Sequence, residues 1–213
     1  MLNIKKIECN ALAENCYIVS DETKECMIVD CGAISPFEQQ AISSYIEANG
    51  LKVVLYVLTH GHFDHCMGSM WVYETYGLQP VISDRDADLY KNCCECAAAL
   101  GYTGLNVTMP AIGRCVNGGD EISFGNTVFK VIHTPGHSHG CVVYYSEKEQ
   151  VAFTGDTLFK GTIGNTSFPE SSMFQMTQSL RTLSQLPAAT RIYPGHGPES
   201  TMEYEGATNP FLE

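Results

Sequence analysis

Short runs of apolar residues, separated by polar or glycine-containing turns, dominate the first part of the chain. The runs at 3–9 (NIKKIEC), 15–20 (NCYIVS) and 26–32 (CMIVDCG) predict strands. The run at 52–58 (KVVLYVL) is continuously apolar, which is typical of a strand that is buried on both faces. We therefore expect this part of the chain to be rich in strands.

Two helices are predicted in the same part of the chain. Ser35, Pro36 and Glu38 form a helix start, because Ser is a good N-cap, Pro suits the first turn and Glu completes a capping box. Apolar residues follow at helical spacing until Asn49-Gly50 ends the helix. These apolar residues are Phe37, Ala41, Ile42 and Tyr45. A second helix is expected from about 65 to 76, where Gly77 would end it.

The rest of the chain also mixes strands with a helix. The segment 121–132 (EISFGNTVFKVI) predicts a hairpin around Gly125-Asn126, and 141–146 and 150–154 predict two more strands. The segment RIY (191–193) indicates a final short strand. The segment 84–118 indicates only a short helix and a glycine-containing loop. One further helix carries an apolar stripe made of Met173, Met176, Leu180 and Leu183.

Two parts of the chain that each mix strands and helices predict two sheets packed face to face, with helices on the outer faces. At 213 residues the chain suits a single domain, 1–213, with a sizeable core. The hydrophobic content of 44% and the charged content of 17% are those of a globular protein.

The net charge of −12 narrows the range of partners. Phosphate groups and anionic membrane surfaces are bound by clustered Lys and Arg, so neither nucleic acid nor a membrane is expected as a partner. The sequence MLNIKKIECN lacks the apolar core of a secretory signal, and no apolar run reaches roughly 18 residues, so a cytoplasmic location is expected. There the ten cysteines would be reduced, and most of them small buried residues.

Four polar segments directly follow apolar strands. THGHFDH (59–65) follows the run 52–58, HTPGH (133–137) follows VFKVI, Gly155-Asp156 follows VAFT, and PGHG (194–197) follows RIY. Strands that enter a sheet from a common side end at one edge, where ligands tend to bind, so the four segments are expected to converge. Their convergence would bring together seven candidate ligands: His60, His62, Asp64, His65, His137, Asp156 and His196.

Imidazole and carboxylate groups in this proportion indicate a metal site. They suit Zn²⁺ best, and Fe or Mn as well. Seven candidate ligands are too many for one tetrahedral ion and fit two divalent ions, because one carboxylate can bridge ions about 3.5–4 Å apart. Glycines at 61, 136 and 195 would let the backbone turn tightly beside a ligand.

The combination of THGHFDH, HTPGHSHG, TGDTLF and YPGHG resembles the metallo-β-lactamase fold, and within it the glyoxalase II-like hydrolases. The similarity runs over nearly the whole chain and includes the closing segment NPFL. It implies an α/β (α+β) fold, a four-layer αββα sandwich with a dinuclear site. By motif position, the resemblance implies a first metal held by His60, His62 and His137, a second held by Asp64, His65 and His196, and a bridge at Asp156.

The resemblance also implies a reaction, in which Asp64 is the candidate catalytic residue as well as a metal ligand. Two metals lower the pKa of a shared water toward roughly 7, and the activated water attacks a carbonyl carbon. A metal then stabilises the oxyanion. A thiolate leaves without a proton donor, so the expected substrate is a small acyl thioester, and the resemblance implies S-acyl-glutathione compounds.

Two features depart from glyoxalase II. Asn165, in LFKGTIGNTSFP, stands where relatives commonly carry an Arg or Lys that helps to hold the glutathione moiety. The chain also stops 17 residues after His196, where full-length glyoxalase II enzymes continue into a helical region that binds glutathione. The expected chemistry therefore rests on more residues than the expected glutathione specificity does.

Other functions share the same residues. A persulfide dioxygenase-like enzyme has the same histidine motifs and uses a single iron, so metal identity and stoichiometry separate the two. A non-catalytic metal-binding protein would use the ligands for structure or sensing. A lactamase is less expected, because Asp156 stands where the classes that confer resistance usually have Cys.

Several of the polar residues also have structural interpretations. Asp64 would suit the N-cap of the helix that follows it. His133 could orient a ligand or be a hydrogen-bonded structural residue, and His139 is expected to be structural or exposed. The cluster Cys93-Cys94-Glu95-Cys96 contains a C-x-x-C pair, but no second pair has zinc-site spacing, which favours a structural role. Three residues are expected to pack in the sheet: Cys141, Tyr144 and Tyr145.

Overall fold

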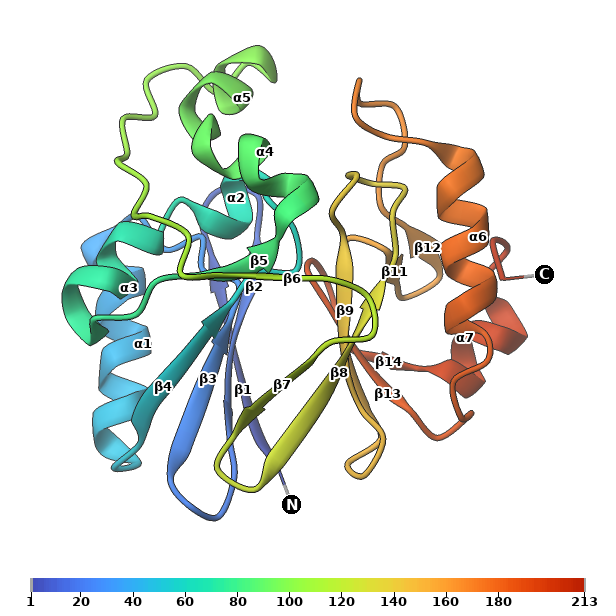
Figure 1. Cartoon of the computed structure of the whole chain (residues 1–213), viewed down its shortest axis with the longest axis horizontal. Helices are drawn as coiled ribbons and strands as arrows, with labels where there is room; N and C mark the ends of the chain where they lie inside the picture. The colour runs from blue at the N-terminus through green and yellow to red at the C-terminus, as the bar shows by residue number, and fades with distance from the viewer. Residues whose placement is uncertain (1, 213) are drawn as a thin grey trace.

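A computed structural model describes residues 2–212 and contains two six-stranded sheets (Figure 1). The first sheet follows the chain order β1-β2-β3-β4-β5-β6. Its first three strands are antiparallel, and β3 to β6 are parallel. The bounds are β1 Asn3–Cys9, β2 Glu14–Ser20, β3 Glu25–Val29, β4 Lys52–Val57, β5 Val81–Ser83 and β6 Arg114–Val116.

The second sheet has the order β14-β13-β10-β9-β8-β7. Strands β7 to β10 are antiparallel neighbours, and β13 pairs in parallel with β10. A separate two-stranded hairpin, β11 and β12, follows β10. The bounds are β7 Glu121–Phe124, β8 Thr127–His133, β9 Val142–Ser146, β10 Val151–Gly155, β11 Leu158–Phe159, β12 Thr162–Ile163, β13 Arg191–Pro194 and β14 Ser200–Thr201.

Helices cover the outer face of each sheet (Figure 1). Helices α1 and α3 lie against the first sheet, α6 and α7 lie against the second, and α2, α4 and α5 gather beyond one end of the first sheet. None of the helices within residues 2–212 has the length and apolar character needed to cross a membrane. The bounds are α1 Pro36–Ala48, α2 Phe63–Cys66, α3 Ser69–Tyr76, α4 Ala87–Lys91, α5 Cys93–Ala99, α6 Met173–Leu183 and α7 Met202–Thr208, with a 3₁₀ turn, η1, at Asp84–Asp86.

Strand β2 shows why the layers stack in this way. All its residues are buried, and successive side chains point to opposite faces of the sheet. Tyr17 packs in the core between the sheets, where its ring lies 5.3 Å from that of Phe153 on β10. Ile18 instead packs in the outer core with Ile42 of α1 and residues of α3. A strand that is apolar on both faces therefore needs a sheet on one side and helices on the other.

The second sheet is built in the same way. Phe153 faces the core between the sheets, whereas its neighbour Ala152 packs with Met176 and Leu180 of α6. The central core therefore lies between the two sheets, and one outer core lies between each sheet and its helices. This arrangement gives four layers in the order α, β, β, α. The fold class expected from the sequence is confirmed.

Helix α1 begins as predicted, and its first apolar residue is not buried. Ser35 accepts a hydrogen bond from the Glu38 backbone N–H, and the Glu38 side chain accepts one from the Ser35 N–H, which completes the capping box. Phe37, the first of the apolar residues at helical spacing, lies in the helix as predicted but is 84% exposed. Ile42 and Ile46 form the buried face instead, one helical turn apart.

The helix predicted from about 65 to 76 is interrupted. The chain forms a short α2 and then α3, with Gly68 between them. The Gly68 N–H donates to the Cys31 carbonyl at 2.9 Å, and a side chain at Gly68 would lie 2.8 Å from that oxygen. The chain at Gly68 therefore packs against the loop after β3, and the helix is interrupted there. A glycine permits this contact because it has no side chain to obstruct it.

The segment 84–118 contains more structure than its sequence indicates. It holds η1, α4 and α5, then an extended stretch, and ends in β6, which joins the edge of the first sheet. Strands of two or three residues such as β5, β6 and β14 are too short to show a period of two, so the sequence did not predict them.

Candidate metal centre

The four polar segments predicted to converge do meet at one edge of the paired sheets. Strand β8 runs in the direction of β10 because both are antiparallel to β9, and β13 is parallel to β10. Their ends, together with the loop after β4, bring all seven candidate residues together, in overlapping groups whose ligand atoms lie within 4.8 Å of one another. Parallel strand direction therefore explains how positions far apart in sequence reach one site.

His60, His62 and His137 form a buried three-histidine cluster. His62 Nδ1 lies 2.8 Å from His137 Nε2, and the His60 ring lies 4.9 Å from the His62 ring and 5.0 Å from the His137 ring, measured between centroids. Three imidazoles with ring nitrogens this close form a pocket that suits one cation.

Asp64, His65 and His196 form a second group, the carboxylate-containing cluster. His196 Nε2 lies 3.2 Å from both Asp64 Oδ2 and His65 Nε2. His65 is fully buried, whereas the His196 side chain is 24% exposed. His62, and not Asp64, occupies the N-cap of α2, so Asp64 lies inside the first turn with its carboxylate free to face the cluster.

Asp156 lies between the two clusters. Its Oδ2 is 3.5 Å from His137 Nε2 and 3.6 Å from His196 Nε2, and its Oδ1 is 3.4 Å from His65 Nε2. One carboxylate thus faces histidines of both groups, which is the arrangement a bridging ligand needs.

Every histidine of the two clusters has its outer ring nitrogen held by another group. Such contacts fix the tautomer and the orientation of a metal-binding imidazole. The partners of the three-histidine cluster are the Thr59 hydroxyl for His60, Glu170 Oε1 for His62 and the Asn165 carbonyl for His137. The partners of the other cluster are Asp30 Oδ2 for His65 and the Leu12 carbonyl for His196.

Asp30 was missed by the sequence reasoning and supports the site from behind. It has a positive φ of 55° directly after β3, a conformation that Asp tolerates better than most residues. Its carboxylate accepts from the Thr59 N–H at 2.7 Å and from the Thr59 hydroxyl at 2.8 Å, and it holds His65 Nδ1 at 3.0 Å. A buried carboxylate with three partners positions both the ligand loop and a ligand.

Asp86, from the segment with no clear sequence pattern, ties two ligand loops together. Its carboxylate accepts from the Gly61 N–H at 3.0 Å and from Ser138 Oγ and the Gly140 N–H at 2.6 Å each. Gly61 lies between two candidate ligands, and Ser138 follows His137 directly. No local motif marked Asp86 or Glu170, because each is a single acid whose partners lie far away in sequence.

The electrostatics of the two clusters differ. Burial lowers the pKa of His60 and of His137, so these imidazoles are neutral and able to bind a cation. Burial acts in the same direction on His65, but Asp64, Asp156 and Asp30 raise its pKa well above the usual value. Burial alone would raise the pKa of Asp156, but His65 and its other histidine neighbours bring it well below the usual value.

Unpaired buried atoms indicate that the residues fit a bound metal. His60 Nε2 and Asp156 Oδ1 are buried and make no hydrogen bond. A buried polar atom without a partner costs roughly 1–3 kcal/mol, so groups like these are usually satisfied by a ligand. Nitrogen and carboxylate donors aimed at a common point are those that bind Zn²⁺, Fe or Mn.

Gly195 lies directly against the side chains of two candidate ligands. A side chain there would collide with Asp156 Oδ1 and would lie 2.6 Å from His65 Cε1. Its N–H also donates to the Gly155 carbonyl at 2.9 Å, which joins the loop after β13 to the end of β10. The close approach of these two loops therefore requires a residue without a side chain.

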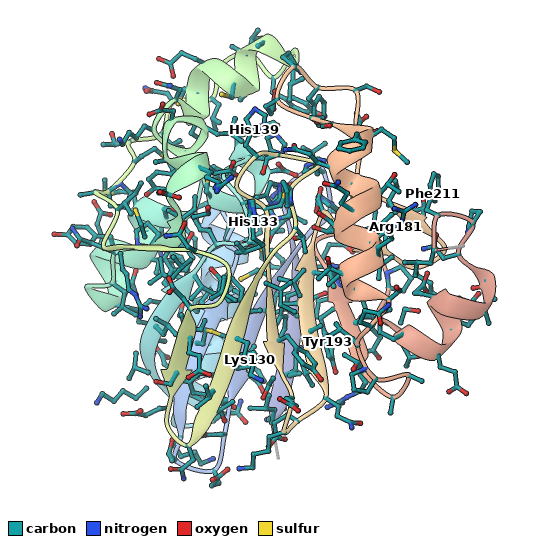
Figure 2. The ribbon with its side chains drawn as sticks, turned by 45° about the vertical axis from the view of Figure 1, so that its right-hand side comes forward. Lys130, His133, His139, Arg181, Tyr193 and Phe211 are labelled. Carbon is teal, nitrogen blue, oxygen red and sulfur yellow. The ribbon has the colours of Figure 1, made fainter. Side chains whose placement is uncertain are left out.

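The weaker candidates lie outside the clusters. His133 Nε2 lies 2.9 Å from the His139 carbonyl, and Figure 2 shows both residues at the β8–β9 connection. His139 is exposed, as expected. Cys93 is buried, whereas Cys94 and Cys96 are only partly buried, and none of the three belongs to a metal-binding group of the described residues. The burial of Tyr144 and Tyr145 within β9 confirms that they pack in the sheet, whereas Cys141 is buried but lies directly before β9 begins.

A pocket of about 370 Å³ opens onto the centre. Aromatic rings form much of its wall: the Phe168 ring lies 5.3 Å from that of His62 and 5.6 Å from that of His137. The size is within the range of ligand sites, roughly 300–1,000 Å³. The lining residues are Leu12, His62, Phe63, Asp64, Leu100, Tyr102, His137, Asp156, Phe159, Asn165 and Phe168.

Comparisons with known proteins agree with this arrangement. Hydroxyacylglutathione hydrolase GloC from Haemophilus influenzae is 32% identical over 214 residues, which cover 99% of this chain and 98% of that protein. BLEG-1 B3 metallo-beta-lactamase has a TM-score of 0.89 at 29% identity, covering 100% of this chain and 99% of that chain. TTHA1623 in a di-iron-bound form has a TM-score of 0.86 at 32% identity, covering 98% of this chain and 100% of that chain.

The family model described as the Metallo-beta-lactamase superfamily matches residues 9–196. The match spans every one of the seven candidate residues, from His60 to His196. The chain belongs to the metallo-beta-lactamase superfamily, whose members bind metal ions and are mostly hydrolytic enzymes.

Proposed function

We propose that the protein is a dinuclear metal-dependent hydrolase of small acyl thioesters, similar to glyoxalase II. The observation that carries the proposal is the position of Asp156, whose carboxylate oxygens lie 3.4–3.6 Å from histidine nitrogens of both clusters. The proposed ligands are His60, His62 and His137 for one ion, Asp64, His65 and His196 for the other, and Asp156 for both. Zinc is the proposed metal, and the di-iron form of TTHA1623 supports iron as the alternative.

Two bound divalent ions would lower the pKa of water toward about 7 and polarise the carbonyl of a substrate. Phe168, against the rings of His62 and His137, limits the access of bulk water to that side of the centre. Asp64, at the wall of the pocket, is positioned to accept a hydrogen bond from the attacking water, which orients it toward the carbonyl.

The pocket lining favours a leaving group that departs as an anion. Apart from the candidate ligands, its described residues include no His, Lys or Arg that could protonate a leaving amine. A thiol has a pKa of about 8.5, so a thiolate leaves without such a donor. The relative named as a hydroxyacylglutathione hydrolase supports the same bond type.

The test combines metal analysis with activity measurements on the purified protein. We expect about two metal ions per chain and thioester hydrolysis that a chelator abolishes and added metal restores. His60→Ala should lose both metal and activity, whereas His139→Ala, at an exposed histidine outside the clusters, should keep both.

Other outcomes would replace the proposal. One iron per chain with oxygen consumption on a persulfide would favour a dioxygenase. Chelator-sensitive cleavage of a β-lactam but not of a thioester would favour a lactamase. Bound metal with no hydrolysis of thioesters, esters, lactones or lactams would favour a non-catalytic metal-binding protein.

A further inference from the structure

A second pocket, of about 480 Å³, adjoins the pocket at the metal centre. The two pockets share the side chains of Leu12, Phe63 and Tyr102, so these residues form the wall between them. The floor comes from the loop after β1 and from α2, and the far side comes from the extended segment 102–107. A substrate that reaches the centre therefore has a second compartment within reach.

Neither pocket is lined by a Lys or Arg among the described residues. The adjoining pocket is lined by uncharged residues only, and the one at the centre has no charged residue except candidate ligands. The apolar residues of the adjoining pocket are Ala11, Leu12, Ile34, Phe63, Met67, Leu105 and Val107, with Tyr102 beside them.

Two polar residues in and after the β11–β12 hairpin make contacts within the protein. Asn165 accepts a hydrogen bond from the Ser167 N–H through its side chain and holds His137 through its carbonyl. Lys160, in the turn between β11 and β12, lines a different pocket with Arg191 and lies 5.1 Å from the Tyr204 ring.

We propose that the substrate is a thioester with an uncharged, apolar arm, and that this arm occupies the pocket between Phe63, Tyr102 and Val107. The proposal rests on the proposed hydrolase function and names the substrate class for that site. In the reaction, the oxygen of water forms a bond to the carbonyl carbon and the C–S bond breaks. The products are a carboxylate, a thiol and one proton released to solvent, with no oxidation or reduction.

Burial explains why this pocket selects against charge. An ionised arm would lose part of its hydration against this apolar lining without gaining an opposite charge, which is unfavourable. An apolar arm gains from each buried methylene, and the gain corresponds to about threefold to fourfold in binding. The glutathione moiety carries two carboxylates, so the pocket suits it poorly.

The first experiment measures kcat/KM along two series of thioesters. One series has a fixed neutral thiol, N-acetylcysteamine, and acyl chains from acetyl to hexanoyl, and the other has a fixed acetyl group and alkyl thiols of increasing length. We expect kcat/KM to rise roughly a hundredfold over four methylenes in one of the two series, which identifies the arm that enters the pocket. S-lactoylglutathione should be a poorer substrate than the hexanoyl thioester.

A pair of matched variants tests the location. Val107→Asp places a carboxylate in the pocket and should abolish the dependence on chain length, whereas Val128→Asp, on the exposed face of β8, should preserve it. Binding of non-hydrolysable ketone analogues, measured by calorimetry, should show the same loss of chain-length dependence in Val107→Asp without relying on turnover.

A second substitution covers the case in which Val107→Asp fails to fold. Thr103 is exposed at the pocket, and Thr103→Lys should raise kcat/KM for a succinyl thioester at least tenfold relative to the butanoyl thioester. Thr103→Gln, with similar length and no charge, should leave that ratio unchanged.

The outcomes separate the two proposals. Hydrolysis that is flat along both series, or that is faster with S-lactoylglutathione, overturns the apolar pocket and leaves the hydrolase function in place. Where the acyl series shows the chain-length dependence, an unchanged succinyl-to-butanoyl ratio in Thr103→Lys also overturns the pocket assignment; where the thiol series shows it, the same holds for the ratio of an ω-carboxyalkyl thiol to the neutral thiol of equal length. Absence of any chelator-sensitive thioester hydrolysis overturns both.

Discussion

The two clusters at the sheet edge lie side by side but are built from opposite chemistry. The three-histidine cluster is buried, and burial lowers the pKa of His60 and His137. The carboxylate-containing cluster is more open at His196, and its carboxylates raise the pKa of His65 and His196 despite their burial. His60 and His137, with lowered pKa values, therefore need to release no proton before they bind a cation. His65 and His196 carry protons below their raised pKa values, and a cation must displace these protons.

The comparison predicts that the two ions of the proposed dinuclear centre are bound with different strengths. Neutral imidazoles need no proton release before they bind a metal, whereas protonated ones do. The outer contacts run the opposite way, because His65 of the carboxylate-containing cluster is held by the buried Asp30, and His62 of the three-histidine cluster by the partly exposed Glu170. We expect the ion in the three-histidine cluster to be the less exchangeable of the two.

Removing the charge that joins the clusters should have the largest effect. Asp156→Asn keeps the size of the side chain and removes one anionic ligand from both ions, so metal affinity and hydrolysis should fall at least a hundredfold, beyond the roughly 10–100-fold typical of outer contacts. Metal content after dialysis and kcat/KM measure this. Asp84→Asn, at an exposed position, is the control. Two tightly bound ions in Asp156→Asn would contradict the bridging position.

Gly195→Ala should separate the clusters. The added methyl group would collide with Asp156, which faces both clusters, and would crowd His65, which belongs to the carboxylate-containing cluster alone. The metal content should fall from about two ions per chain to about one. Gly206→Ala is the matched control, because no heavy atom lies within 4 Å of an added side chain there. Equal loss of both ions would show that the two clusters do not bind independently.

Asp30→Asn should weaken one cluster more than the other. The amide cannot reproduce the carboxylate's contact with His65 together with its two bonds to Thr59. Affinity for the second ion should fall roughly 10–100-fold, with a smaller change for the first. Stepwise metal titration of the chelator-treated protein measures both constants. A uniform loss at both sites would mean that Asp30 acts through the fold as a whole.

A change in pH should have the smallest of these effects on metal affinity, and the effect should differ between the two clusters. His65 has a raised pKa in the metal-free protein, so below that pKa a metal must displace its proton. The affinity of the carboxylate-containing cluster should therefore fall about tenfold for each unit of decreasing pH per proton displaced. The three-histidine cluster, in which burial lowers the pKa of His60 and of His137, should respond less over the same range. Identical pH slopes for both ions, in metal titrations between pH 6 and 8, would remove the distinction.

The residues of the two clusters could be predicted from sequence because each follows a recognisable strand. The run KVVLYVL became β4, and THGHFDH lies at its end, so a local pattern placed four candidate residues at once. Parallel strand order then brought the later segments to the same edge. The capping box of α1 is local in the same sense, and it formed as predicted.

What the sequence could not supply are the contacts made across the fold. Asp86 is one acid within a segment without a period, and its partners at Ser138 and Gly140 lie 52 and 54 positions away. Glu170 reaches His62 across 108 positions. The interruption at Gly68 also depends on a distant backbone, that of Cys31. No window of neighbouring residues contains this information.

The attachment of the last ligand loop to the second strand has a consequence for biosynthesis. The Asn15 N–H donates to the Gly195 carbonyl, and the Tyr17 hydroxyl donates to the Pro194 carbonyl across 177 positions. The N-terminal part of a chain is synthesised first, so β2 is made long before residues 194 and 195. These hydrogen bonds can therefore form only when translation is nearly finished. A nascent chain halted before residue 194 would contain the residues of the three-histidine cluster but lack His196, so the carboxylate-containing cluster is complete only near the end of translation.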